Sequence, residues 1–483
     1  MSSLITRISR ITAAHWVLVI GVICAISLGV LISKFEWLGL IGMLGLWLGV
    51  AFMVFLYDRP DLGVHIMLIY CFFVPLLGRE LYPIQFGIGV EVLMVLTLLV
   101  ALFNSKKENW SNINNDLTGL TLMWFIISVL QLANPAGASV LGWVQEIRGA
   151  AVHALIIIPL VFVLFNQKKH LDRFIYVIII CSVFGALNGM RQLYVGLLPG
   201  ERIFLEANAS THLLWGQMRV FSFFTDAGMF GASQAHIALI SGVLIFGPFK
   251  FWQRALFAIA TGILLYGMLI SGTRGALFVL VFGAVGAVFL FKNFKVLFVG
   301  LFFGIIALGV LKYTHIGSGN YHIYRLRTAL DPQDASLNLR FENQRILRSY
   351  LADKPFGEGL GVIGAWGHKY NSHKFLSTVE PDSYWVKVWA MYDIVGLTIW
   401  FAMMLYIIGK CCGIVWNIRD PELKVKLIAL CAGTIGIFVS SYGNEVINRI
   451  PASLIVYMSW AFIYLAPKWD TKEPASVQPT INS

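Results

Sequence analysis

The chain contains about fourteen long apolar runs, and this repetition decides what kind of fold the sequence can form. A helix needs about 20 apolar residues to cross the hydrocarbon core of a bilayer. Of the 483 residues, 58% are hydrophobic and 13% are charged, whereas about a quarter of the residues in soluble domains are charged. The runs do not alternate with a period of two, which excludes a transmembrane barrel. The sequence therefore predicts an all-α, polytopic transmembrane helical bundle of about 14 spans.

The distribution of basic residues predicts the orientation of these spans. The N-terminus and the segments after even-numbered spans contain 18 of the 36 Lys and Arg residues, and the short segments after odd-numbered spans contain 5. Cytoplasmic loops carry the excess of Lys and Arg, so both termini are predicted to be cytoplasmic. The net charge of +11 thus indicates topology and not a nucleic-acid partner. The predicted spans start near Ala13, Trp37, Leu62, Ile84, Leu117, Ile147, Leu171, Met229, Ala255, Ala276, Val296, Ser383, Val425 and Ser453.

Two long polar segments interrupt the apolar runs, at 199–226 and 313–382, and both are predicted to face outward. The second segment is rich in arginine, histidine and carboxylates, which is typical of a chain that leaves the lipid. We expect it to form a cap that contains a short helix at 338–353 and a flexible glycine-rich turn after Pro355.

Three arginines from separate parts of the chain are predicted to lie on the outer face. Arg274 belongs to S-G-T-R-G at 271–275, between two spans, while Arg219 precedes a span and Arg340 begins the cap helix. Arginine forks fit phosphate oxygens. For each arginine taken alone, a solvated or structural role is the alternative. An anion site is favoured because all three are expected to converge on the same face.

The cap also contains candidates for acid–base chemistry. His373 and His368 lie in the glycine-rich loop, and Glu380 and Asp382 flank Pro381 at the start of the next span. A histidine or a carboxylate can accept a proton as a general base. The alternatives are that the histidines are merely exposed loop residues and that the carboxylates merely pair with arginines. There is no H-E-x-x-H and no clustered third ligand, so no metal is predicted.

Two further features are candidate sites. The sequence G-x-G-x-x-G at 359–364 follows a helix and a proline rather than a strand, which favours close packing of a turn over a dinucleotide site. Glu91 lies within a predicted span, so it is either functional or paired with a neighbouring span.

Three motifs occur in a fixed order in the second half of the chain. They are S-G-T-R-G at 271–275, P-x-G-x-G at 355–359 after the arginine-containing cap helix, and D-S-Y-W at 382–385 leading to a D-x-x-G-L turn at 393–397. These motifs resemble the shared core of the O-antigen ligase and O-antigen polymerase family of bacterial membrane proteins. The upstream R-V-F at 219–221 resembles that family's outer arginine segment.

The resemblance implies a metal-independent glycosyltransferase without a cofactor, which uses a polyprenyl-diphosphate-linked glycan at the outer face of the bacterial inner membrane. By this resemblance Arg219, Arg274 and Arg340 bind the diphosphate. The family commonly has His-Asn where this chain has Pro381-Asp382. The catalytic base is therefore expected to be Asp382, Glu380 or His373.

With this core, the chain is expected to divide into four parts. They are N-terminal transmembrane helices at 1–254, the ligase/polymerase-like core at 255–410, C-terminal transmembrane helices at 411–467, and a disordered cytoplasmic tail at 468–483.

Two acceptors remain open: a second lipid-linked repeat for a polymerase, and a lipid A core for a ligase. The departure from the ligase-like histidine pattern favours the polymerase. Membrane lipids are the other expected partners. A transporter or flippase, which places ionisable residues in mid-span, is one alternative, and Glu91 and Arg191 are its only indications. A non-catalytic partner in polysaccharide assembly is another.

Overall fold

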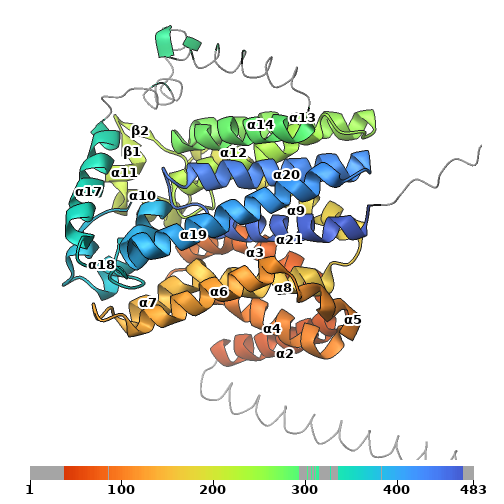
Figure 1. The fold of residues 1–483 in the computed structure, drawn as a ribbon, viewed down its shortest axis with the longest axis horizontal. Helices are drawn as coiled ribbons and strands as arrows, with labels where there is room; N and C mark the ends of the chain where they lie inside the picture. Colours follow the sequence, from red (N-terminus) through yellow and green to blue (C-terminus); the bar gives the residue numbers. More distant parts are fainter. Residues whose placement is uncertain are drawn as a thin grey trace, which may run out of the picture. The chain divides into compact units, whose positions relative to one another are not determined.

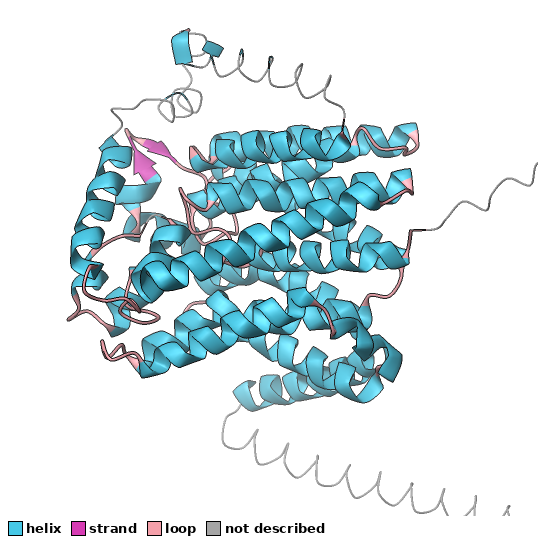
Figure 2. Ribbon diagram, in the orientation of Figure 1, coloured by secondary structure: helices cyan, strands magenta, loops and turns pink. Residues whose placement is uncertain are grey.

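The chain forms two structural units. The computed structural model describes residues 37–84, 86–292, 335–381 and 383–470, with a few positions between 302 and 327. The units are Met1–Leu62 and Gly63–Ser483. In the first unit the described residues form α2 (Trp37–Asp58) and the start of α3. The second unit consists almost entirely of helices (Figures 1 and 2).

The second unit contains the long helices of the fold. These helices are α3 (Pro60–Glu80), α4 (Ile88–Asn104), α6 (Asp116–Leu130), α7 (Val140–Ile147) continued by the π-helix η3 (Arg148–Val152) and α8 (His153–Leu164), α9 (Lys168–Tyr194), α12 (Ala227–Leu244), α13 (Phe251–Ile270), α14 (Gly275–Phe291), α19 (Tyr384–Asn417), α20 (Pro421–Ser440) and α21 (Ala452–Leu465).

The shorter elements lie between them. They are α5 (Lys107–Trp110), η1 (Ser111–Ile113), η2 (Gln131–Ala133), α10 (Pro199–Ala207), α11 (Ala209–His212), the antiparallel strands β1 (Leu213–Leu214) and β2 (Gln217–Met218), α17 (Ala335–Leu351), α18 (Gly364–Tyr370), η4 (Phe375–Thr378) and η5 (Ala466–Lys468).

Eight helices within the described ranges are long and apolar enough to cross a membrane. The predicted class, an all-α multi-pass membrane protein, is thereby confirmed. Three more predicted spans coincide with α4, α14 and α21, which have 14 to 17 residues. The predicted spans that start near Ala13 and Val296 lie outside the described residues.

The predicted start of the sixth span at Ile147 is wrong, because the helix begins at Val140. Two charged residues, Glu146 and Arg148, flank the predicted start. Both are neutralised by other segments: Glu146 pairs with Lys387 and Arg148 pairs with Glu91. The helix therefore continues through the π-helix η3 into α8 without a break.

Helix α12 lies at the centre of the second unit. Of its span, 89% is buried, and it packs against α9, α13, α14 and α20. Helices α14 and α20 pack closely because a glycine separates them. A Cβ added to Gly436 would lie 2.4 Å from the carbonyl oxygen of Val279, and such small residues allow helix backbones in membranes to approach one another.

Most of the short elements gather at one end of the bundle, which we call the α17 end. Helices α10, α11, α17 and α18 and the β1–β2 hairpin lie at the left of Figures 1 and 2. The two long polar segments were predicted to lie on one face, and the described parts of both do lie at the same end. The predicted cap helix at 338–353 is observed as α17, three residues earlier at its start and two at its end.

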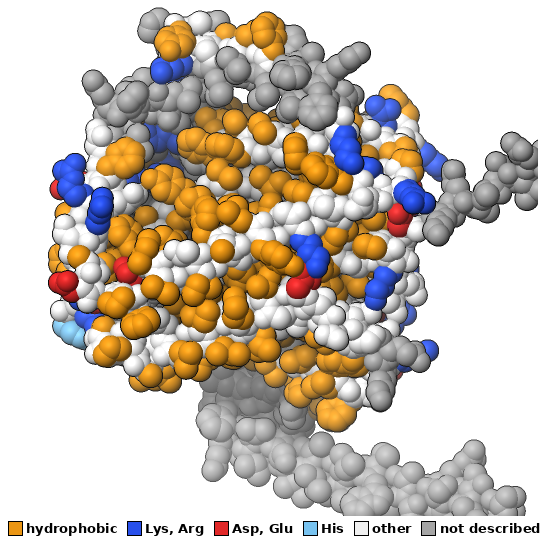
Figure 3. Space-filling model, viewed as in Figure 1, with side chains coloured by type: hydrophobic (Ala, Val, Ile, Leu, Met, Phe, Trp, Pro, Cys, Tyr) orange, Lys and Arg blue, Asp and Glu red, His pale blue; other side chains and the backbone are white. Residues whose placement is uncertain are grey.

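The opposite end of the bundle is strongly basic. Several of its lysines pair with carboxylates of other helices, such as Lys168 with Asp420 and Lys426 with Asp172. Between the two ends, hydrophobic side chains cover most of the flank (Figure 3). The basic residues at this end are Lys106, Lys168, Lys169, Arg173, Lys250, Arg254, Lys292, Lys410, Arg419, Lys424, Lys426 and Lys468.

The glycine-rich turn is buried and tightly packed, so the prediction that it is flexible was wrong. Gly357 has a φ of 69°, and a Cβ added there would lie 2.5 Å from the carbonyl carbon and oxygen of Met391. The next two amides, of Glu358 and Gly359, donate hydrogen bonds to carbonyls of α19 at 390 and 391. This contact coincides with a kink in α19 at Asp393, where φ is 51°.

Replacing Gly357 by alanine is expected to lower the melting temperature of the detergent-solubilised protein by several degrees. The added methyl group collides with the α19 backbone and the residue keeps a positive φ, which costs more than about 1 kcal/mol. The control is Gly409→Ala, on an exposed helical surface where a Cβ meets no atom within 4 Å. Equal melting temperatures for the two variants would contradict this packing.

Candidate functional site

Arg219 is fixed against the turn that connects α13 and α14. Its Nη2 donates to Thr273 Oγ1 at 3.2 Å, and its Nη1 donates to the carbonyl oxygen of Thr211 at 2.9 Å. The turn holds its own shape, because the amide of Thr273 donates to Ser271 Oγ at 3.1 Å. Arg219 therefore lies beside the predicted motif at 271–275.

The turn that contains Arg274 and the side chain of Arg340 lie against the end of α20 and the loop that follows it. Ser440 Oγ donates to the carbonyl oxygen of Gly275, the residue after Arg274, at 2.9 Å. In the loop after α20, a Cβ added to Gly443 would lie 3.7 Å from Arg340 Nη1. The structure thus places Arg219, the turn of Arg274 and Arg340 around one junction at the α17 end, which we call the arginine junction.

The candidates for the catalytic base lie in different surroundings. Asp382 is outside the described residues, but the chain directly after it is anchored: the amide of Tyr384 donates to the carbonyl oxygen of Ser441 at 2.9 Å. Glu380 pairs with His368 at 2.9 Å, and both side chains are more than half exposed. His373 is exposed between α18 and η4. Of the three candidates, Asp382 is the nearest in sequence to Tyr384, whose amide is bonded to the loop after α20.

A buried ionic cluster beside this junction was not predicted from the sequence. Lys387 Nζ lies 2.9 Å from Glu146 Oε2 and 3.2 Å from Glu445 Oε2, and Arg449 lies 3.0 Å from Glu445. We call these four residues the Lys387 cluster. The sequence contains one signal for this cluster, because Glu146 and Lys387 are isolated charges near the same end of two apolar runs. An isolated charge in such a place needs a partner of opposite sign.

The charge state of Glu445 is set by its two cationic neighbours. Burial by itself raises the pKa of this carboxyl, but the charges of Lys387 and Arg449 outweigh burial and lower the pKa to about 2. Glu445 is therefore ionised throughout the physiological range and cannot act as a base. Its role is to hold positive charges.

A second polar group surrounds His212 on α11. Burial lowers the pKa of His212, and the positive charge of Arg219 lowers it further, while Asp226 opposes this shift. The ring nitrogen Nε2 accepts a hydrogen bond from the amide of Ala227 at 3.3 Å. Asp226 caps α12 by accepting from the amide of Met229. These contacts fix the chain that leads into α12.

The two readings of Glu91 are now distinguished by its contacts. Its Oε1 lies 2.9 Å from Arg148 Nε and 3.2 Å from His153 Nε2. The carboxylate therefore pairs with the neighbouring helix, which was one of the two alternatives. In the part of the chain that the structure describes, no three His, Cys, Asp or Glu side chains come together as metal ligands do.

An apolar groove of about 450 Å³ opens close to the arginine junction. It lies between the α3–α4 connection and Thr225, and its size falls in the range of small-molecule sites, about 300–1,000 Å³. Thr225 is two residues from Ala227, whose carbonyl oxygen accepts from Thr273 Oγ1 at 2.7 Å. The groove is lined by Val74, Pro75, Gly78, Tyr82, Pro83, Ile84, Phe86, Gly87, Thr225 and Ile450.

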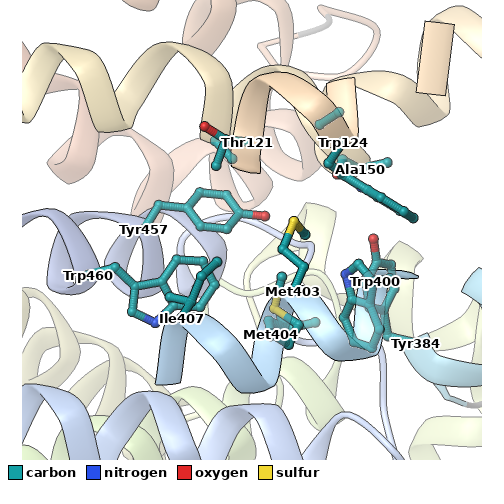
Figure 4. Close-up of a pocket in the computed structure, with 13 residues that line it drawn as sticks. Thr121, Trp124, Ala150, Tyr384, Trp400, Met403, Met404, Ile407, Tyr457 and Trp460 are labelled. Atoms are coloured by element: carbon teal, nitrogen blue, oxygen red, sulfur yellow. The ribbon is translucent and has the colours of Figure 1, made fainter. Parts of the chain in front are cut away.

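A second, much smaller cavity lies among α6, α19 and α21 (Figure 4). Its volume is about 30 Å³, and aromatic and methionine side chains of α6, α19 and α21 surround it, including Trp124, Trp400 and Trp460. This volume equals the share of one water molecule in the liquid. The cavity is therefore too small for a lipid chain.

The difference in stability between the wild type and Glu445→Gln is expected to shrink as the pH falls from 5 toward 2. Because the folded pKa lies below the unfolded value of about 4.3, the ionised carboxylate stabilises the protein above pH 4.3, by an amount on the order of 3 kcal/mol. This contribution is lost as the carboxyl is protonated near pH 2. The measurement is the melting temperature in detergent at each pH.

The matched control is Glu380→Gln, since the side chain of Glu380 is 65% exposed. Its melting temperature is expected to follow the wild type at every pH. A constant gap between the wild type and Glu445→Gln from pH 5 to 2.5 would contradict the assignment of Glu445.

Comparison with known proteins leaves the family of this chain open. No model of a protein family matches it, and no curated protein does. What sequence and structure together establish is a multi-pass helical membrane protein with eight candidate spans among its described residues.

Proposed function

We propose that this protein is a glycosyltransferase that moves a glycan from a polyprenyl-diphosphate carrier to an acceptor sugar at the outer face of a bacterial cytoplasmic membrane. The observation that carries the proposal is the gathering of Arg219, Arg274 and Arg340 at one end of the bundle. They come from three distant parts of the chain, so their common location depends on the fold.

The arginine junction suits the leaving group of this reaction. As the bond between sugar and phosphate breaks, negative charge develops on the diphosphate. Guanidinium groups already held in place stabilise that charge without rearranging. Their fork geometry matches phosphate oxygens, and the end of a helical bundle is where the phosphate of a membrane lipid lies.

The apolar groove is proposed to hold the first isoprene units of the carrier. It begins two residues from Ala227, which is hydrogen-bonded to the turn of Arg274. Successive Cα atoms are about 3.8 Å apart, so the groove is within about 8 Å of this contact along the chain. A diphosphate at the junction and a prenyl chain in the groove therefore fit one molecule.

Asp382 is the proposed base, because the acceptor hydroxyl must lose its proton. The residues that follow it are bonded to the loop of the arginine junction. Glu380 and His373 are the alternatives, and both are exposed at the surface. A second lipid-linked repeat is the preferred acceptor, which makes the protein a polymerase, and lipid A core is the alternative, which makes it a ligase.

The orientation follows from charge. The basic end of the bundle is proposed to face the cytoplasm by the positive-inside rule, which places the arginine junction outside. No ATP is available there, so the donor must be activated beforehand, as a lipid diphosphate is.

Arg274→Ala and Arg340→Ala are each expected to lower transfer by about 10²-fold or more, as the loss of a group that stabilises developing charge does. The measurement is the gel profile of surface glycans from a deletion strain that carries each variant at equal membrane abundance. The matched control is Arg345→Ala. Arg345 lies on α17, as Arg340 does, and its side chain is 79% exposed.

The deletion strain itself identifies the acceptor. Single repeats on lipid A core indicate a polymerase, whereas bare core with long chains on the carrier indicates a ligase. Unchanged glycans in the deletion strain, or in both arginine variants, would contradict the proposal.

A further inference from the structure

Lys387 joins three segments at the α17 end of the bundle. It lies on the first part of α19, at 384–392, before the kink at Asp393. Its ammonium group contacts Glu146 of α7 and Glu445 of the loop after α20, and at most 12% of any of these side chains is exposed. Three charges are therefore buried together at a place where helices and loops meet.

This arrangement is a poor device for stability alone. Removing charges from water costs several kcal/mol per ion, and well-packed apolar side chains are often as stabilising or more so. The ion pairs instead define how the three segments are placed relative to one another. Each carboxylate, of Glu146 or Glu445, joins its own segment to Lys387.

A short path of contacts leads from Lys387 to the arginine junction. Next to Glu445, Asn444 Nδ2 donates to Ser440 Oγ at 2.8 Å, which in turn donates to the carbonyl oxygen of Gly275. On its other side the same loop holds Gly443, which lies against Arg340.

The same loop also holds the start of α19. Its carbonyl oxygens at 441 and 444 accept from the amide of Tyr384 at 2.9 and 3.1 Å. The position of the loop thus affects two diphosphate-binding candidates and the chain beside Asp382.

We propose that Lys387, acting through Glu445, is a positioning residue that holds the loop at 441–449 so that Arg274 and Arg340 meet the reacting diphosphate. This inference rests on the function proposed above. It assigns no contact with substrate to Lys387 itself.

The chain offers a matched control at its opposite end. Lys426 of α20 is also nearly buried, with 9% of its side chain exposed, and it also lies between two carboxylates, Asp172 and Glu422. The two lysines thus share their type of surroundings, but Lys426 is at the basic end of the bundle.

The first experiment compares Lys387→Met with Lys426→Met in the purified full-length protein, with a synthetic prenyl-diphosphate glycan as donor. Both variants are expected to lose thermal stability, since each leaves carboxylates without their lysine. Only Lys387→Met is expected to lower kcat, by about 10- to 100-fold as misplaced groups do, with a smaller change in the KM for the donor. Equal kcat values for the two variants would overturn the inference.

The second experiment separates position from stability. Lys387→Met combined with Glu146→Leu removes a neutral pair and leaves Glu445 paired with Arg449. This double variant is expected to regain most of the lost stability while kcat stays low. If kcat returns together with stability, the cluster is structural and the inference is overturned.

These outcomes are distinct from a failure of the proposed function. If the wild type transfers no glycan from the donor, the proposed function fails and the inference fails with it. If the wild type is active, Arg274→Ala is inactive and the double variant is fully active, only the inference is overturned.

Discussion

The structure depends on the requirement that backbone polar groups inside a bilayer be hydrogen-bonded within the protein. Helices meet this requirement by themselves, and the described spans of this chain are all helical. Irregular backbone is displaced to the two ends, where water or protein can satisfy it. The arginine junction, the Lys387 cluster and the tight glycine turn are all at one of these ends, because only there can the chain place loops beside one another.

The two ends of the bundle differ in how deeply their ion pairs are buried. At the basic end, lysines pair with acids whose side chains remain partly exposed, as Lys426 does with Asp172. At the α17 end, charges from distant segments are buried together, as Glu146, Lys387 and Glu445 are. The first arrangement anchors helices at a surface, and the second determines how separate loops are placed.

The sequence alone predicted what depends on local pattern. Apolar length gave the spans, and the alternation of charge placed both long segments at one end together with Arg219 and Arg274. It could not predict the partner of Lys387, because Glu146 is about 240 residues away. The helix start at Val140 was missed for the same reason, since Glu146 and Arg148 appear unsuitable for a span until their distant partners are known.

The kink at Asp393 divides α19 into two parts with different attachments. The part before the kink is bonded to the glycine turn and to the loop after α20, and the part after it packs in the bundle. A positive φ at a residue other than glycine costs on the order of 1–3 kcal/mol, so the contacts on both sides of Asp393 must outweigh that cost. Aromatic contacts across the kink, such as Tyr384 with Trp400 and Trp385 with Phe401, hold the bend in place. One helix thereby supplies Lys387 to the ionic cluster and Trp400 to the aromatic interior of the bundle.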